Sequence, residues 1–274
     1  MPTDAVQKSA PVAVVLICHQ DDESGAYLQI LRHRQQGRRV VFACFTRGVM
    51  GDLDETRRNT ESIDVLRRLG VEASDIVFAG SLLGIDDQAL VDNLPMAAAW
   101  LREWLASLGP LEVIYTLAWE GGHPDHDALH VISARVCHEL GVLDKLRQYP
   151  LYNSYQRPWQ FFRALYPLPA NGPVERIRIP WPLRIRFLGF SFLYPSQLKS
   201  WLGILPFFIL HYVFRGTAQL QAVSLERITE RPHEGELYYE KRGFSTWGYM
   251  QRRVSEYLAS GPEVIAQPSL HTQQ

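Results

Sequence analysis

Cysteine is scarce in this chain of 274 residues, and a long uninterrupted apolar segment is missing. Cys18, Cys44 and Cys137 are too few and too scattered for a disulfide framework, so a reducing compartment is expected. The longest apolar run, 201–214, contains Pro206 and is too short for a comfortable membrane span. The polar N-terminus lacks the apolar core of a signal peptide. Together these features predict a cytoplasmic protein.

An excess of positive charge is also missing. The 28 Lys and Arg residues are balanced by 29 Asp and Glu residues, which argues against a general nucleic-acid binder. The balance is uneven along the chain, however. Residues 1–150 hold 14 basic and 21 acidic residues, whereas residues 151–274 hold 14 and 8.

The first 150 residues alternate short β-branched runs with longer helical patterns. Strands are predicted at 11–18, 39–45, 75–79 and 112–117, and helices at 24–36, 55–69, 95–108 and 124–140. This repetition predicts an α/β fold, a Rossmann-like parallel sheet with helices on both faces. Right-handed crossovers place the loops that follow the strands at one edge, where open sheets of this kind bind their ligands.

Prolines divide the chain into short pieces after residue 150. Strand-like stretches are predicted within 177–192, a hydrophobic helix interrupted by proline at 198–214, and a strand at 236–240. We expect residues 1–150 to form an α/β core. Residues 151–274 are expected to complete the same domain as an aromatic-rich C-terminal cap that shapes the substrate pocket.

Two clusters of polar residues follow predicted strands. Residues 18–23 (Cys-His-Gln-Asp-Asp-Glu) come after the first strand, and residues 120–127 (Glu-Gly-Gly-His-Pro-Asp-His-Asp) come after the fourth. Packing does not explain such clusters, because buried unpaired charge is costly. Histidine and carboxylate from one loop with histidine from another form the ligand set of a catalytic zinc site. Such a set also suits other divalent ions, such as Fe²⁺.

At these clusters the sequence resembles the PIG-L or LmbE-like family of zinc-dependent N-deacetylases. That family usually has Ala/Pro-His-Pro-Asp-Asp-Glu as its first motif and His-Pro-Asp-His as its second, here at 123–126. Weaker matches in the chain are Thr46-Arg47-Gly48, Arg58-x-x-Glu61, Leu69-Gly70-Val71, Asp87 and Ser196-Gln197. The resemblance covers 12–140 well and the remainder thinly. It implies that the α/β core at residues 1–150 is a metal-hydrolase core.

The resemblance implies a role for each matched residue of the two main motifs. His19, Asp22 and His126 would bind zinc. Asp21 would be the general base that activates water and later protonates the leaving amine. His123 would stabilise the tetrahedral oxyanion.

Two further matched residues would bind substrate, and two positions depart from the family pattern. Arg58 and Asp87 would hold sugar hydroxyls. Gln20 stands where the family usually has proline, so the loop loses a fixed φ angle. Gly121 stands where some members have tyrosine.

The function implied by the resemblance is hydrolysis of the acetamide of an N-acetylglucosamine-type amino sugar in a glycoconjugate or glycolipid. The alternative is a catalytically silent zinc- or sugar-binding protein of the same fold. A dinucleotide-dependent oxidoreductase is disfavoured because no G-x-G-x-x-G follows the first strand. Nucleophilic hydrolysis lacks support, since neither Ser24 nor Cys18 lies in a G-x-S-x-G turn.

Residues 151–225 combine basic and aromatic side chains. They hold eight Lys and Arg residues, a single acid, Glu175, and 16 of the 31 aromatic residues of the chain. One interpretation is a packed cap with its charges in water. The other is peripheral contact with a membrane or a lipid-linked substrate, because basic residues and aromatics favour lipid headgroups.

Overall fold

The structure is a computed structural model that describes residues 11–260. Seven strands form one sheet in the order β3-β2-β1-β4-β5-β9-β8. The strands are β1 Val12–Ile17, β2 Val40–Cys44, β3 Ile76–Phe78, β4 Leu111–Leu117, β5 Leu146–Tyr149, β8 Glu175–Arg178 and β9 Thr217–Ala222. The first five pair in parallel, and β9 and β8 extend the sheet in antiparallel fashion. The predicted α/β fold with a mostly parallel sheet is confirmed.

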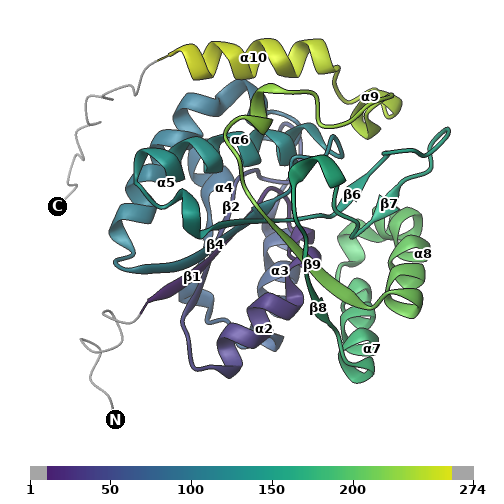
Figure 1. Cartoon of the computed structure of the whole chain (residues 1–274). Coiled ribbons are helices and arrows are strands. Elements are labelled where there is room, and N and C mark those ends of the chain that lie inside the picture. The colour runs from purple at the N-terminus through teal and green to yellow at the C-terminus, as the bar shows by residue number, and fades with distance from the viewer. Residues whose placement is uncertain (1–10, 261–274) are drawn as a thin grey trace.

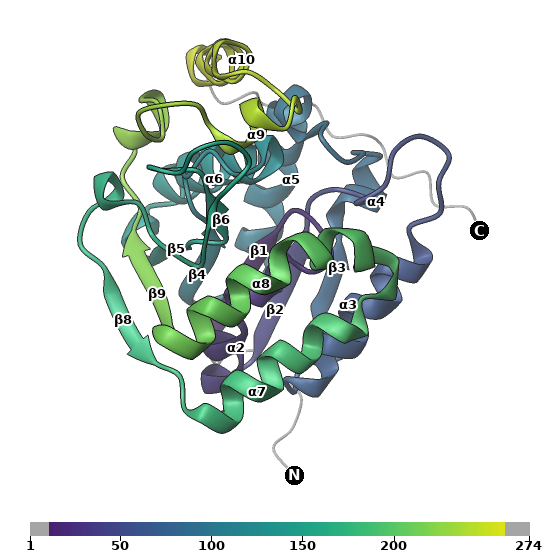
Figure 2. The same ribbon diagram turned by 90° about the vertical axis from the view of Figure 1, so that its right-hand side faces the viewer.

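Helices cover both faces of the sheet (Figure 1). Those of the first half are α2 Tyr27–Gln35, α3 Thr56–Arg68, α4 Ala79–Leu83, α5 Leu94–Ser107 and α6 Pro124–Glu139. α5 and α6 pack against each other on one face, while α2 and α3 lie on the opposite face (Figures 1 and 2). All six residues of β1 are buried, as expected for a central parallel strand covered on both sides.

The second half adds β8 and β9 to the sheet and builds a wall beside it. Its other elements are the hairpin β6 Tyr152–Asn153 and β7 Arg163–Ala164, and the helices α7 Trp181–Phe190, α8 Leu198–Phe214, α9 Tyr238–Lys241 and α10 Trp247–Ala259. The hydrophobic helix predicted at 198–214 is confirmed as α8, with Pro206 inside it. None of the helices between residues 11 and 260 is long and apolar enough to cross a membrane.

Two predictions for the second half are wrong. The strand expected within 177–192 ends at Arg178, and α7 begins at Trp181. Pro182 in the first turn of α7 suits a helix start, where no N–H is needed. The strand expected at 236–240 is instead the start of α9, because the Glu240 carboxylate accepts the backbone N–H of Leu237 and caps a helical turn (2.9 Å).

Strand order places two loops side by side. β1 lies between β2 and β4, so the chain reverses its direction of crossing at β1. β1 and β4 pair in parallel, with Val15 opposite Tyr115, and both strands end at the same edge. The loops after β1 and β4 therefore meet at the topological switch point, where ligands bind in sheets of this type.

Glycine at residue 80 is required for the close packing of α4 on the loop after β2. A Cβ atom on Gly80 would lie 2.2 Å from the carbonyl carbon of Thr46. We expect Gly80→Ala to lower the free energy of unfolding by about 1–3 kcal/mol, because neither backbone can move freely. The matched control is Gly189→Ala in α7, where a Cβ meets nothing within 4 Å. Urea unfolding should show a lower free energy of unfolding for Gly80→Ala and no decrease for Gly189→Ala.

Candidate metal centre and active site

The loop after β1 is organised by two buried carboxylates, those of Asp22 and Glu23. Asp22 Oδ2 accepts the backbone N–H groups of Cys18 (3.2 Å) and His19 (2.7 Å). Glu23 Oε2 accepts the backbone N–H of Asp21 (2.8 Å). Asp21 has a φ of 122°, a conformation that costs an L-residue about 1–3 kcal/mol. The loop thus holds Asp21 in a strained backbone conformation, and this residue lines a cavity.

Side chains also tie this loop to α3 and to the second half of the chain. Glu23 Oε1 accepts hydrogen bonds from the hydroxyls of Ser62 (2.6 Å) and Tyr194 (2.8 Å). The Gln20 amide is buried and donates to Asn59 Oδ1 (2.6 Å). A hydrogen-bonded glutamine therefore anchors the loop at the position where the sequence lacks the expected proline.

The loop after β4 enters α6 through a histidine cap. His123 Nδ1 accepts the backbone N–H of Asp125 (3.3 Å) at the start of the helix. Asp127 Oδ1 accepts the backbone N–H of Glu120 (3.1 Å), which folds the loop back onto the helix. The His123 and His126 rings lie on one side of this helix, with 5.2 Å between their centroids.

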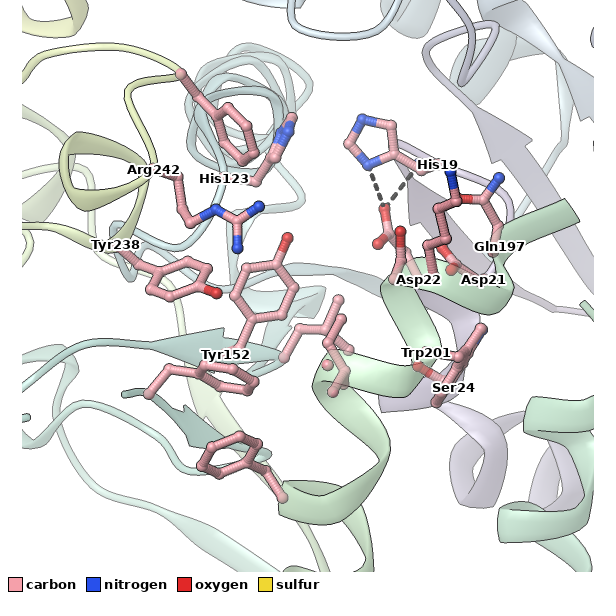
Figure 3. A pocket seen from close by; sticks show the side chains of 18 of the residues that line it. His19, Asp21, Asp22, Ser24, His123, Tyr152, Gln197, Trp201, Tyr238 and Arg242 are labelled. Carbon is pink, nitrogen blue, oxygen red and sulfur yellow. Dashed lines mark hydrogen bonds and ion pairs between the residues drawn. The ribbon is translucent and has the colours of Figure 1, made fainter. Parts of the chain in front are cut away.

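Three of the predicted residues form a compact set of ligand atoms. His19 Nδ1 lies 3.3 Å from Asp22 Oδ2, and His126 Nε2 lies 3.2 Å from Asp22 Oδ1 and 3.4 Å from His19 Nδ1. Zinc bonds of about 2.0–2.1 Å separate tetrahedral ligands by about 3.3–3.4 Å. His123 also lies within 4.8 Å of the ring nitrogens of His19 and His126. Figure 3 shows the side chains of His19 and Asp22 facing each other.

The charge around these histidines also fits a cation. Four carboxylates lie on or beside the cluster: Asp21, Asp22, Asp87 and Asp125. Arg58 brings a single guanidinium to the same end of the cavity. Several buried carboxylates need compensating positive charge, so the donor set is suited to a divalent metal ion.

The pKa values of Asp21 and Asp22, which are adjacent in the loop after β1, are shifted in opposite directions. Burial alone would raise the pKa of Asp22, but the imidazoles of His126 and His19 outweigh it and hold that pKa well below its usual range. Burial and the charge of Asp22 raise the pKa of Asp21 to about 8. A bound cation would lower the pKa of Asp21 from this value, because positive charge favours the carboxylate. Two carboxyls with divergent pKa values fit one ligand and one acid–base group.

The second nitrogen of His19 is oriented by Asp125, a residue to which the sequence assigned no role. His19 Nε2 lies 3.0 Å from Asp125 Oδ2, and Asp125 also accepts the backbone N–H groups of Gln88 (2.7 Å) and Leu90 (3.0 Å). Such a carboxylate fixes the ring orientation and tautomer of a metal-binding histidine. The one feature of the sequence that could have indicated this role is the position of Asp125 inside the second motif, next to His126.

His123 presents an N–H group to the cavity. Its Nδ1 accepts from the backbone of Asp125, so the ring proton lies on Nε2 in the neutral form. Burial lowers the pKa of His123 to about 3, and the nearby His19 acts in the same direction. His123 Nε2 lies 3.8 Å from Asp87 Oδ1, too far for a hydrogen bond.

The two residues expected to bind sugar have contacts within the protein. The Arg58 guanidinium donates to the carbonyls of Gly48 and Gln20 (3.3 Å to the latter), which joins the loops after β1 and β2. Asp87 Oδ1 lies 3.1 Å from His19 Nε2. Both side chains still line the cavity.

The cavity has a volume of about 710 Å³, and its far wall comes from the second half of the chain. Tyr152 of β6, Tyr238 of α9 and Arg242 point into it opposite Asp21 and Asp22 (Figure 3). Sequence reasoning missed these three residues, because they lie outside both motifs in a region with little periodic pattern.

Comparison with known proteins finds a family whose model matches the first half of the chain. The family model described as GlcNAc-PI de-N-acetylase (PIG-L) matches residues 14–137. This segment contains both motifs, and over it the chain is similar to the PIG-L family of LmbE-like deacetylases. No curated protein matches the sequence.

Solved structures share the fold at low sequence identity. The A40926 pseudoaglycone deacetylase is 18% identical over 81% of this chain and 98% of its own, with a TM-score of 0.59. N,N′-diacetylchitobiose deacetylase from Pyrococcus horikoshii is 17% identical over 78% and 84%, with a TM-score of 0.52. A zinc-inhibited form of teicoplanin deacetylase is 18% identical over 68% and 84%, with a TM-score of 0.51. At these identities the likeness concerns the fold alone.

The contact between Asp125 and His19 predicts an effect on metal binding. We expect Asp125→Asn to weaken the affinity for a divalent metal by about 10–100-fold, because the His19 ring loses its charged partner. Competition with a chromophoric chelator measures this affinity. Asp54→Asn, at an exposed position, should leave it unchanged. Equal affinities for the two variants would exclude an orienting role for Asp125.

Proposed function

We propose that the protein is a zinc-dependent N-deacetylase that hydrolyses the acetamide of an N-acetylglucosamine-type amino sugar in a glycoconjugate or glycolipid. The observation that carries the proposal is the compact set of His19, Asp22 and His126 with Asp21 beside it. The family model that matches residues 14–137 is described as GlcNAc-PI de-N-acetylase. Two of the similar structures are named as deacetylases, one of the A40926 pseudoaglycone and one of N,N′-diacetylchitobiose.

His19, Asp22 and His126 would hold the metal ion. When bound, zinc supplies Lewis acidity, which polarises an amide carbonyl and makes water more acidic. The ionised state of Asp22 suits ligation, since a ligand must be deprotonated. Asp125 keeps His19 in the tautomer that offers Nδ1 to the metal.

Asp21 is proposed as the general base. It lines the cavity next to Asp22 and accepts a proton from water as the water attacks the acetamide carbon. The proton then passes from Asp21 to the amine that leaves, and acetate is the other product. The hydrogen bond from the Asp21 backbone N–H to Glu23 keeps the Asp21 carboxyl beside the proposed metal ligands.

His123 is proposed as the oxyanion donor. Its Nε2–H is directed by the cap that Nδ1 forms at the start of α6, so the donor is oriented before substrate arrives. A preoriented donor of this kind contributes about 2.7–4 kcal/mol to transition-state stabilisation. Tyr152, Tyr238 and Arg242 are proposed to contact the sugar or its attached group, together with Arg58.

Acetate release tests the proposed reaction. Metal-free protein is incubated with a panel of N-acetylglucosamine conjugates, with and without stoichiometric Zn²⁺, Fe²⁺ or Co²⁺. We expect metal-dependent release of acetate from at least one conjugate. Because a teicoplanin deacetylase is known in a zinc-inhibited form, zinc is tested at one equivalent and in excess. Tight binding of one metal ion without acetate release from any conjugate would favour the silent sugar-binding alternative.

Two substitutions separate the base from a ligand. Asp21→Asn should keep metal binding and lower kcat by about 10²–10⁴-fold, because it removes the proton acceptor. His126→Ala should lose both metal and activity, because it removes a ligand. Metal content is measured by atomic absorption on the same samples as kcat. Full turnover by Asp21→Asn would show that another group is the base.

A further inference from the structure

A broad apolar surface lies on the outside of α7 and α8. The two helices pack side by side and face the viewer in Figure 2. We call this surface the α7–α8 face. Its exposed residues are Trp181, Ile185, Phe192, Leu198, Leu202, Pro206, Ile209, Leu210, Val213 and Phe214. Apolar patches of this extent are uncommon on the surface of a soluble monomer and mark a place of interaction.

Most of the circumference of α8 is apolar, although only one side is buried. At about 100° per residue, the exposed apolar side chains from Leu198 to Phe214 occupy an arc of about 160°, within which Lys199 is the charged residue. The buried side chains Trp201, Phe208 and Tyr212 occupy the opposite arc. Residues 200–214 contain no charged side chain. A helix that is apolar on all sides is expected to be covered on all sides, so the exposed arc lacks its partner.

Basic residues lie on the two helices of this face and on neighbouring elements. Those with exposed or half-buried side chains on α7, at the ends of α8, on β8 and in the β6–β7 hairpin are Arg186, Lys199, Arg215, Arg176, Arg178, Arg157 and Arg163. None of them forms an ion pair with a carboxylate between residues 11 and 260. Glu175 is the single acid within 151–225. The partner of the face is therefore expected to carry negative charge around an apolar interior.

We propose that the α7–α8 face docks on the surface of an anionic lipid bilayer, with α8 lying in the plane of the headgroups. Interfacial binding requires apolar side chains that enter the bilayer and basic residues that attract anionic headgroups, and this part of the protein has both. A second copy of the chain fits the face less well, because a symmetric dimer would bring two sets of unpaired positive charge together. The proposal does not depend on the deacetylase reaction.

Docking in this orientation holds the cavity next to the lipid. Lys199, Trp201 and Phe207 of α8 line the cavity, while Leu202 on the same helix belongs to the α7–α8 face. Trp159, which is 82% exposed, also lines the cavity. Exposed tryptophan is favoured at the level of the lipid headgroups.

Vesicle flotation tests the proposal with the full chain. Vesicles of phosphatidylcholine alone are compared with vesicles that contain about 30% phosphatidylglycerol. We expect the protein to float with the anionic vesicles at low salt, less with neutral vesicles, and less with anionic vesicles at high salt. The double variant Leu202→Glu, Ile209→Glu should lower the partition coefficient about tenfold or more. The matched control is Leu82→Glu on α4, at a residue that is 70% exposed outside the face, and it should bind as wild type does.

A second variant keeps the test independent of the fold of α8. Phe192→Glu changes a residue that is 73% exposed in the short helix Ser191–Leu193 after α7, and it should weaken binding in the same direction. Circular dichroism shows whether each variant is folded. Absence of wild-type binding to anionic vesicles would overturn the proposal. So would a lipid-free dimer, seen by light scattering, that the double variant abolishes, because the face would then bind a second copy.

Discussion

The active-site architecture depends on a carboxylate, Asp22, that is bound on both sides. One oxygen is held by two backbone N–H groups of its own loop, from Cys18 and His19, and the other faces His126. A carboxylate buried to this degree is costly unless hydrogen bonds and positive charge satisfy it. The backbone supplies the hydrogen bonds at the end of β1, and the imidazoles, or a metal ion between them, supply the charge. The position of Asp22 thereby sets the relative position of the loops after β1 and β4.

Buried acids also join the two halves of the chain. Glu23 accepts a hydrogen bond from Tyr194, and Glu61 of α3 accepts the backbone N–H of Ser196 (3.1 Å). In each pair the first half contributes the carboxylate and the second half contributes the donor. Loss of either donor would remove one of the hydrogen bonds that stabilise a buried acid, which is more costly than loss of an exposed hydrogen bond. The second half therefore supports the loop after β1 and helix α3, and it also forms one wall of the cavity.

The sequence predicted the first half well because its signals are local. A strand covered on both faces is a continuous apolar run, as in β1, and polar residues that follow such a run are conspicuous. His19, Asp21, Asp22 and His123 were found in this way and line one cavity, with His126 beside them. The second half gave weaker signals, because its short elements depend on contacts far along the chain. Tyr152, for example, lines the cavity, and its backbone N–H binds the carboxylate of Glu120, 32 residues earlier in the chain (2.9 Å).

Gln20 and Asp21 bear on whether the site is active or silent. The absence of proline at residue 20 removes a fixed φ, yet the buried Gln20 amide replaces this constraint with a hydrogen bond to Asn59. The neighbouring Asp21 keeps a φ of 122°, and such strain persists only where surrounding contacts overdetermine the conformation. Glu23 provides that contact through the Asp21 backbone N–H. A site that only held a metal ion would have no use for a strained, cavity-facing carboxylate beside its ligands, because a structural zinc site is closed by four ligands. The conformation of Asp21 therefore favours a hydrolytic role over a silent one.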